Sequence, residues 1–286
     1  MLRVLDYFFF ARPVLFFPAW STLLLLSKDV PLNGMIFFIT ACVMGSCFVI
    51  NQIADVESDK INGKCLFLNE SIISYKQAIL YAALLFILSI SFSTTYQLFL
   101  VCIFFLVTGV LYNLKPFHWK QFPFLGALAN FLMGFFIAFF AYPDLSFVNE
   151  KELVGLSVLN FVVYILTTLP DIKGDKRTQK RTIGVVLGEQ NSIFLCIVFS
   201  VVNFFLLSDR TELLLIQTIL FGLLVFQSLA KRSYIIVMIK IVLMAQALVA
   251  CFFYPFYLIL ILGMFFGGRW NYKKRFSLTY PSFENE

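Results

Sequence analysis

Two groups of acidic residues have the types and the spacing of a metal site. Asn51, Asp55 and Asp59 follow one another at intervals of four residues, and on an α-helix such residues fall on nearly one line. Asp171 and Asp175 repeat the spacing of the last two of these residues. Each group comes where a long apolar run ends. The sequence therefore predicts two Asp-x-x-x-Asp pairs, each at the end of an apolar helix.

Carboxylates gathered in this way need cations, because like charges about 4 to 6 Å apart raise one another's pKa. Oxygen ligands favour hard cations such as Mg²⁺, which usually completes its shell with water and the phosphates of a substrate. Basic residues suited to phosphate oxygens stand between and after the two acidic groups. They are Lys115, Lys120, Lys176, Arg177, Lys180 and Arg181. The combination predicts a diphosphate site, and the apolar runs beside it predict a substrate with an apolar end.

The composition predicts an integral membrane protein. Hydrophobic residues make up 60% of the chain, charged residues only 13%, and the mean hydropathy is +0.89. This is more apolar surface than a soluble core of 286 residues can hide. Runs this long form helices in lipid, where the backbone must bond internally. The expected fold class is all-α, a multi-pass transmembrane bundle forming one domain over residues 1–286.

Nine apolar runs approach the length of about 20 residues that a helix needs to cross a bilayer. The last stretch, 233–266, is longer than one crossing and contains Lys240, so we expect its first part to lie in the interface as an amphipathic segment. The expected spans are 13–27, 34–54, 77–94, 96–113, 122–142, 153–170, 191–208, 212–230 and 241–266.

The distribution of Lys and Arg predicts the orientation of the chain. Alternate loops hold fourteen such residues on the side of the N-terminus and three, Lys28, Lys151 and Arg210, on the other. Positive loops stay in the cytoplasm, so we expect the N-terminus there. The net charge of +6 thus indicates topology and lipid headgroups rather than nucleic acid. With nine spans, four basic residues of the tail would lie outside: either the count is off by one or those charges are tolerated. They are Arg269, Lys273, Lys274 and Arg275.

The two acidic groups are expected on one face of the membrane. The first follows the second expected span and the second follows the sixth, so that an even number of crossings separates them. The chain is therefore predicted to have two pseudo-repeated halves, each with an Asp-rich loop on the cytoplasmic side. A bacterial chain of this kind would lie in the cytoplasmic membrane.

Other types of site have few residues to build them. His118 is the only histidine, which argues against a His-based zinc site or a Ser-His-Asp triad. The six cysteines are scattered without a C-x-x-C pair and are typical of packing residues. Taken alone, Asn51 serves equally well to bond a neighbouring helix.

In its two acidic motifs and the segment between them, the chain resembles the UbiA superfamily of intramembrane prenyltransferases. The family's N-x-x-x-D-x-x-x-D signature stands here as Asn51, Asp55 and Asp59, and its D-x-x-G-D form as 171–175. The segment 112–120, Tyr-Asn-Leu-Lys-Pro-Phe-His-Trp-Lys, is similar to the family's Tyr-Ser-x-Pro-Pro-x-Arg-x-Lys. The resemblance runs from Arg12-Pro13 to at least Gly188.

The chain also departs from the family pattern. The Arg-Pro-x-Arg-Pro run that commonly follows the first signature is absent, His118 stands where Arg is usual, and Gln179 stands where Gly or a third Asp is common. These departures leave the expected Mg²⁺ site in place and leave the acceptor open.

The resemblance implies transfer of a prenyl group from a polyprenyl diphosphate to an aromatic acceptor of the quinone-precursor type. It implies Mg²⁺ ligands and diphosphate ligands in overlapping sets, with Lys120 and the four aspartates as catalytic residues. The metal set is Asn51, Asp55, Asp59, Asp171 and Asp175. The diphosphate set is Asn51, Lys115, Lys120, Lys176, Lys180 and Arg12, although Lys115 serves the acceptor equally well.

Three alternatives stay open. The same fold serves a different acceptor reaction, namely transfer to a glycerophosphate lipid or a porphyrin, or phosphoribosyl transfer to polyprenyl phosphate. A cation transporter also places acidic residues near membrane spans, but here they stand at span ends and few ionisable groups lie at mid-membrane. A purely structural scaffold is the third alternative.

Overall fold

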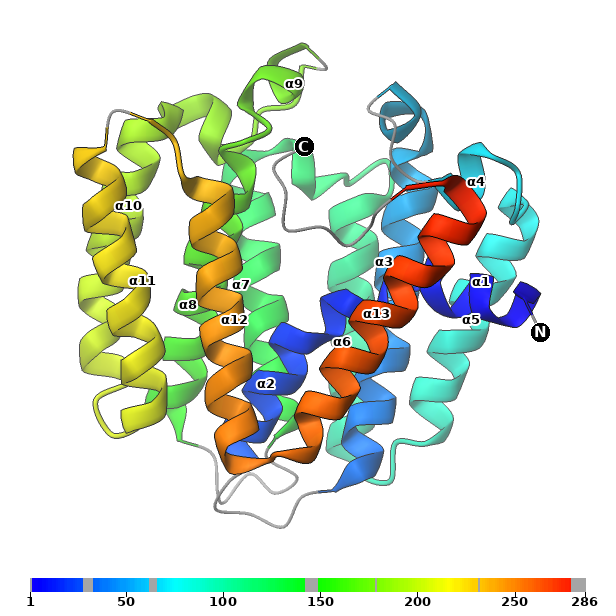
Figure 1. The fold of residues 1–286 in the computed structure, drawn as a ribbon, viewed down its shortest axis with the longest axis horizontal. Coiled ribbons are helices and arrows are strands. Elements are labelled where there is room, and N and C mark those ends of the chain that lie inside the picture. Colours follow the sequence, from blue (N-terminus) through cyan, green and yellow to red (C-terminus); the bar gives the residue numbers. More distant parts are fainter. Residues whose placement is uncertain are drawn as a thin grey trace.

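The computed structural model describes residues 2–27, 33–61, 66–141, 149–177, 179–230 and 232–278. These residues form a bundle of helices, without a strand among them (Figure 1). Two short 3₁₀ segments, η1 (Pro13–Phe16) and η3 (Trp119–Gln121), join longer helices. The helices are α1 (Leu2–Phe10), α2 (Phe17–Leu26), α3 (Gly34–Ile61), α4 (Leu66–Asn69), α5 (Tyr75–Ser91), α6 (Tyr96–Asn113), α7 (Pro123–Phe140), α8 (Glu150–Thr168), α9 (Ile172–Arg177), α10 (Ile183–Leu206), α11 (Thr211–Leu229), α12 (Ile235–Phe253) and α13 (Phe256–Phe276).

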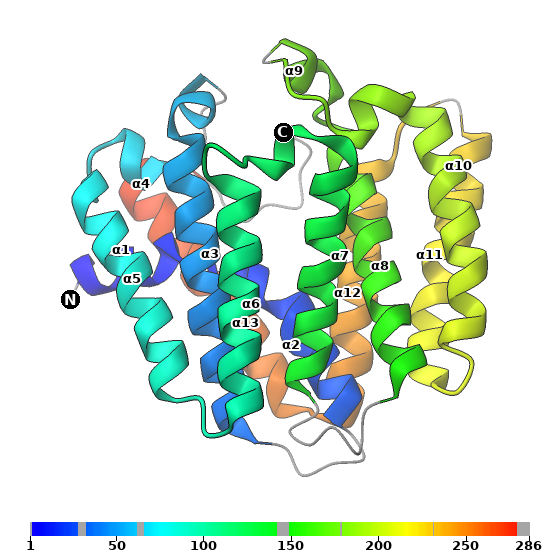
Figure 2. The same cartoon turned by 180° about the vertical axis from the view of Figure 1, so that it is seen from behind.

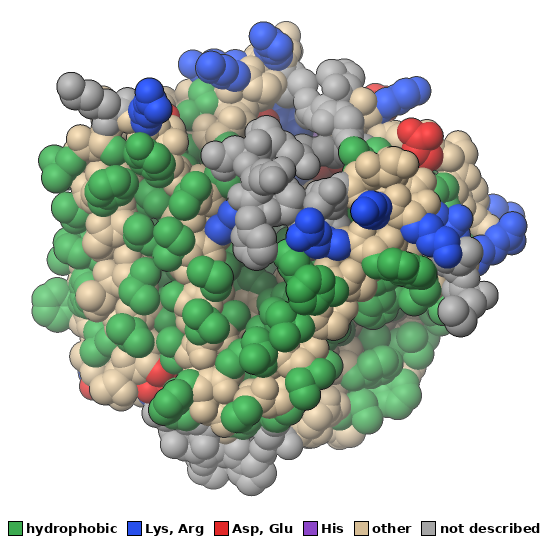
Figure 3. Space-filling model, in the orientation of Figure 1, with side chains coloured by type: hydrophobic (Ala, Val, Ile, Leu, Met, Phe, Trp, Pro, Cys, Tyr) green, Lys and Arg blue, Asp and Glu red, His purple; other side chains and the backbone are tan. Residues whose placement is uncertain are grey.

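The helices have the length and composition of membrane spans, which confirms the expected fold class. Within the described residues, eight helical segments are long and apolar enough to cross a bilayer, and α5 is a shorter apolar helix. Hydrophobic side chains cover the middle of the surface, whereas Lys and Arg gather at the end that carries α4 and α9 (Figure 3). The chain is an integral membrane protein.

Local sequence explains where several helices begin. Ser74 and Gln77 form a capping box at the start of α5, in which each side chain accepts a hydrogen bond from the other residue's backbone N–H. Asn149 caps α8 through its side-chain oxygen, which accepts hydrogen bonds from the backbone N–H groups of Lys151 and Glu152. Pro123 opens α7, where its missing N–H leaves no helix hydrogen bond unmade.

Side-chain amides and hydroxyls tie neighbouring helices together inside the apolar bundle. Such bonds fix the register of helices where apolar packing alone does little to distinguish one neighbour from lipid. They join α3 to α5 (Ser46 Oγ to Ala82 O, 2.9 Å), α8 to α7 (Asn160 Nδ2 to Asn130 O, 2.8 Å), α10 to α11 (Asn203 Nδ2 to Gln217 Oε1, 2.9 Å) and α12 to α2 (Gln246 Nε2 to Thr22 Oγ1, 2.8 Å).

The prediction of one last span over 241–266 is wrong. The chain forms two helices there, α12 and α13, because Pro255 interrupts the helical hydrogen bonds after Tyr254. The expectation of an interfacial segment before this span is also wrong, since Lys240 lies inside α12, a full-length candidate span.

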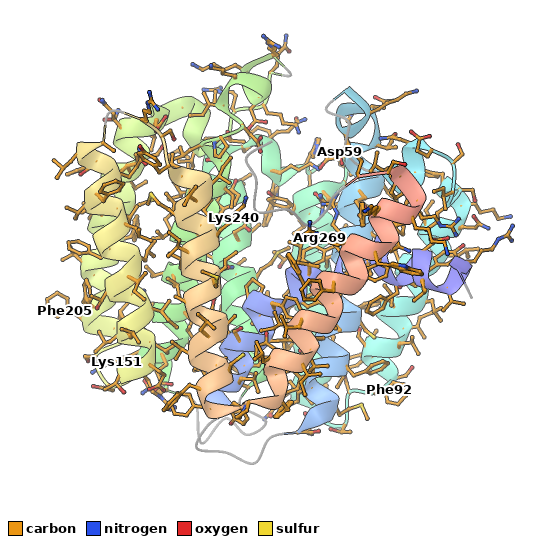
Figure 4. The ribbon with its side chains drawn as sticks, in the orientation of Figure 1. Asp59, Phe92, Lys151, Phe205, Lys240 and Arg269 are labelled. Carbon is orange, nitrogen blue, oxygen red and sulfur yellow. The ribbon has the colours of Figure 1, made fainter. Side chains whose placement is uncertain are left out.

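Because α13 runs back along the bundle, the tail cations reach the end that carries the acidic groups. Figure 4 shows Arg269 and Lys240 in the same half of the bundle as Asp59, with Lys151 at the opposite end. Arg275 at the end of α13 pairs with the buried Asp6 of α1, its Nε donating to Oδ1 at 2.8 Å. The tail cations therefore follow the same charge bias as the other loops.

Helix α10 begins earlier than the expected span at 191. Its first turn, from Ile183, is separated from the rest by Gly188, whose φ of 75° and ψ of 172° are not helical. Only glycine adopts this backbone conformation readily. The helix therefore changes direction at Gly188, shortly after the second acidic group.

Candidate active site

The first acidic group lies on one continuous helix, as its spacing predicts. Helix α3 extends to Ile61, so that Asn51, Asp55 and Asp59 share one face of its last three turns. Gln52 anchors this part of α3, because its Nε2 donates to the carbonyl of Phe10 at 2.8 Å. This bond holds the end of α1, and the half-buried Arg12 that follows it, against α3.

Lys120 is a close partner of the first acidic group. It comes from η3, in the connection between α6 and α7, which crosses the same end of the bundle as α9 (Figure 2). Its Nζ donates to Asp55 Oδ1 at 2.7 Å and to Asn113 Oδ1 at 3.4 Å. The side chains of Lys120 and Asp55 are only 7% and 17% exposed. Burial lowers the pKa of Lys120, and the charge of Asp55 opposes this shift.

The second acidic group lies beyond the end of a helix rather than inside one. Helix α8 ends at Thr168, Asp171 is exposed in the following turn, and Asp175 belongs to the short helix α9. The half-buried Asp175 accepts a hydrogen bond from Thr182 Oγ1 at 3.1 Å through its Oδ2. Its backbone oxygen accepts from the N–H of Lys180 at 2.9 Å. These two bonds fold the chain back from α9 toward α10.

The connection that carries Lys120 also touches the second acidic group. The backbone N–H of Arg181 donates to the carbonyl of Gln121 at 3.3 Å. The charges of Lys180 and Asp59 both act on Lys120. Lys120 therefore lies beside the first acidic group and close to the segment that follows the second.

The structure does not bring the two acidic pairs into one compact ligand cage. Among the described residues, no group of three or more His, Cys, Asp or Glu side chains is placed to hold one metal ion. Each pair nevertheless offers carboxylate oxygens at the same end of the bundle, as Figure 1 shows for the end of α3 and for α9. Oxygen donors of this kind suit Mg²⁺ that takes its remaining ligands from water and substrate.

The remaining basic candidates lie around this end of the molecule. Lys180 is half-buried, whereas Lys115 and Lys176 are exposed. Lys115 belongs to the α6–α7 connection, and Lys176 and Lys180 follow Asp175, so that all three lie beside the segments described above.

Two tyrosines that the sequence did not mark as site residues lie between the acidic groups. Tyr112, at the end of α6, lies beside Asn130 of α7 and Tyr164 of α8, and the charges of Asp55 and Asp175 both act on it. A Cβ on residue 126 would lie only 2.6 Å from the Tyr164 hydroxyl. Glycine at this position therefore leaves space for the tyrosine side chain. Tyr112 stands in the motif segment, but Tyr164 carries no motif that would have singled it out.

His118 occupies the same connection as Lys120. Its side chain is half-buried, and burial lowers its pKa, helped by the charge of Lys120 and opposed by that of Asp55. The imidazole Nε2 is buried and has no hydrogen-bond partner among the described residues.

Comparison with known proteins identifies a family match over most of the chain. The model of the UbiA prenyltransferase family matches residues 14–234. The fold is similar to that of a UbiA homolog from Archaeoglobus fulgidus bound to DMAPP and Mg²⁺, with a TM-score of 0.72, 16% identity, and coverage of 90% of this chain and 99% of that one. The same homolog bound to GPP and Mg²⁺ gives a TM-score of 0.71 at 17% identity, over 90% of this chain and 99% of that one.

Curated relatives match over about half of the chain. The chain is 30% identical over 172 residues to 2-acyl-4-prenylphloroglucinol 6-prenyltransferase of Humulus lupulus, covering 54% of this chain and 42% of the relative. It is 28% identical over 167 residues to homogentisate phytyltransferase of Synechocystis sp., covering 53% of this chain and 54% of the relative. The matched region thus spans only about half the length of these relatives.

Proposed function

Because the chain belongs to the UbiA prenyltransferase family, we propose that it transfers a prenyl group from a polyprenyl diphosphate to an aromatic acceptor within the membrane. The observation that carries the proposal is the position of Lys120, which is buried, paired with Asp55 and close to Lys180 of the segment that follows the second acidic group. Two ammonium groups beside carboxylates suit a substrate that brings its own negative charge. The diphosphate has this property.

The proposed mechanism assigns a role to each group. Asn51, Asp55 and Asp59 on one side, and Asp171 and Asp175 on the other, would hold Mg²⁺. When bound, Mg²⁺ supplies positive charge that stabilises the leaving diphosphate. A diphosphate bound at this end of the bundle would supply further oxygen ligands to such an ion.

The basic residues act directly on the leaving group. As the allylic C–O bond breaks, negative charge grows on the diphosphate oxygens, and ammonium groups aimed at these oxygens lower the barrier. In our proposal Lys120 does so from the centre, assisted by Lys115, Lys176, Lys180 and Arg12. The apolar helices around the site keep water from the allylic cation. A ring carbon of the acceptor then attacks this cation, and the proton of that carbon leaves to the released diphosphate, which restores the aromatic ring.

An aromatic acceptor is supported by the names of the relatives, which include homogentisate phytyltransferases and a phloroglucinol prenyltransferase. A different acceptor on the same fold stays the second candidate, because one solved neighbour is a digeranylgeranylglyceryl phosphate synthase at 18% identity and a TM-score of 0.58. The cation-transport alternative gains no support from the described residues.

We further propose that residues 1–286 form one domain and that the end carrying the acidic groups faces the cytoplasm. The excess of Lys and Arg at this end supports the orientation (Figure 3). Labelling of single cysteines introduced at the exposed Lys173 and Lys151 of intact cells would test it, with only the second accessible from outside.

The function is tested with the purified protein, geranyl diphosphate or a longer prenyl diphosphate, and a panel of four phenols. The panel consists of homogentisate, 7-hydroxycoumarin, naringenin and an acylphloroglucinol. We expect a prenylated product from at least one phenol, lost on addition of EDTA and restored by Mg²⁺. A protein that consumes the diphosphate only with a native lipid extract would favour the second candidate. Metal flux into liposomes without any consumption of diphosphate would favour transport.

A further inference from the structure

The backbone of His118 sets the direction in which its side chain leaves the chain. The residue adopts φ 43° and ψ 48°, a left-handed conformation that is unfavourable for a residue with a Cβ. Two hydrogen bonds keep it there, from His118 N to Leu114 O at 2.8 Å and from Gln121 N to His118 O at 3.0 Å. The side chain is therefore positioned by the fold of the α6–α7 connection.

The imidazole turns one nitrogen into the protein without giving it a partner. Nε2 is buried, and none of the described residues bonds to it. A buried polar atom that makes no hydrogen bond is costly, so that each such atom in a native protein calls for an explanation, such as a bound ligand or a catalytic role. Since His118 lies beside Lys120 in the site, a substrate atom is the natural partner.

The charges around His118 indicate which substrate atom suits it. Those that act on it are Lys120, Asp55, Lys180 and Lys115, in this order. Burial and three ammonium groups lower the pKa of the imidazole, so that the ring is neutral near pH 7 and one nitrogen keeps its lone pair. Diphosphate oxygens only accept hydrogen bonds, and the ammonium groups serve them better. A neutral nitrogen with a lone pair suits a hydroxyl donor instead.

We propose that Nε2 of His118 accepts a hydrogen bond from a phenolic hydroxyl of the acceptor. The inference rests on the proposed prenyl transfer to a phenol and adds the residue that recognises it. The bond holds the ring beside the diphosphate site. It also increases the electron density on the phenol oxygen, and through it on the ring carbon that attacks the allylic cation. No proton needs to be transferred to the imidazole for either effect.

The test compares a phenol with its methyl ether, which lacks the hydroxyl donor. The phenol is the one of the panel that wild type turns over fastest, and kcat/KM is measured for it and for its ether with geranyl diphosphate. For wild type we expect methylation to lower kcat/KM about 30-fold, as for the loss of a hydrogen bond to a buried partner. For His118→Phe, which has no lone pair, we expect less than about a 3-fold difference between the two compounds.

Two further variants make the comparison specific. His118→Gln retains a side-chain acceptor, and we expect it to recover part of the discrimination; it also carries the test if His118→Phe does not fold. Phe117→Leu changes the exposed neighbour on the same connection and should discriminate as wild type does. The KM for geranyl diphosphate should stay within about 2-fold of wild type in all three variants, because the ammonium groups that serve the diphosphate are unchanged.

Four results would overturn the inference. If His118→Phe discriminates against the ether as strongly as wild type, the hydroxyl binds elsewhere. If His118→Phe raises the KM for geranyl diphosphate while discrimination persists, Nε2 serves the diphosphate. If wild type transfers the prenyl group equally to phenol and ether, prenyl transfer stands without a hydroxyl site. A wild type that prenylates none of the panel overturns the proposed acceptor class and this inference together.

Discussion

The two acidic groups share a sequence pattern but differ in how the fold supports them. Asp55 and Asp59 belong to the last turns of α3, a helix of 28 residues, and Asp55 is paired with the buried Lys120. Asp171 and Asp175 follow the end of α8, the second of them on α9, a helix of six residues, and a hydroxyl and backbone bonds connect Asp175 to the start of α10. One group is thus part of the rigid bundle, and the other lies on a short segment outside it.

This difference indicates that the two acidic groups have different roles in the proposed site. A carboxylate on a packed helix has its position before substrate arrives, whereas one on a short surface segment retains freedom to adjust to it. The first group would then be in position before the diphosphate binds, and the second would adjust its position to contact the bound diphosphate. Changes in the first group should therefore affect both the stability and the activity of the protein, whereas changes in the second group should affect mainly its activity.

The largest effect is expected from Asp55→Asn. The change removes a proposed metal ligand and leaves Lys120 buried without its counter-charge, so that kcat should fall about 1,000-fold and the free energy of unfolding by about 3 kcal/mol. Prenyl transfer rates and thermal unfolding in detergent measure the two quantities.

Asp171→Asn is the matched change in the second group, at an exposed carboxylate. It should lower the rate while leaving the unfolding temperature as in wild type, since no buried charge loses its partner. Equal destabilisation by both variants would contradict the distinction between the groups.

The next effect separates stability from activity at the rigid group. Lys120→Met alone should lower kcat about 100-fold, because one donor to the diphosphate is lost. Combined with Asp55→Asn, it should restore most of the lost stability without restoring turnover, since no uncompensated buried charge is left. The double variant is compared with both single ones by unfolding and by rate. Its unfolding at the same temperature as Asp55→Asn would show that Lys120 is not the cause of the instability.

A smaller effect is expected at the second group from Thr182→Ala. Loss of the hydroxyl that bonds Asp175 should raise the KM for the prenyl diphosphate about 5- to 10-fold, corresponding to one hydrogen bond. Thr182→Ser keeps the hydroxyl and serves as the control. If both variants behave alike, the bond does not position Asp175.

The smallest effects concern the link between the two groups. Arg181 bonds Gln121 through its backbone, so that Arg181→Ala should change kcat less than about 2-fold, whereas Arg181→Pro, which has no N–H, should lower it about 5-fold. Steady-state rates of the two variants decide this. Equal rates would show that the contact between the α6–α7 connection and the second group does not matter for turnover.

Much of the fold could be predicted from the sequence, because apolar runs of about 20 residues in lipid have few structures available to them. The four-residue spacing of Asn51, Asp55 and Asp59 fixed their shared face for the same reason. The final hairpin was missed, since residues 241–266 are apolar throughout and hydropathy does not reveal a turn inside such a run. Pro255 was the available signal. It lies near the middle of the stretch and ends one helix there, even though the mean hydropathy of the stretch is that of a single span.

The membrane class, the helices and the two acidic groups at one end of the bundle follow from composition and spacing alone. The pairing of Lys120 with Asp55, 65 positions away in the chain, and the position of Tyr112 beside Tyr164 depend on tertiary packing. Periodicity relates residues within one helix, whereas contacts between helices depend on how whole surfaces pack. The left-handed backbone of His118 likewise follows from the fold of a connection, and no spacing in the sequence encodes it.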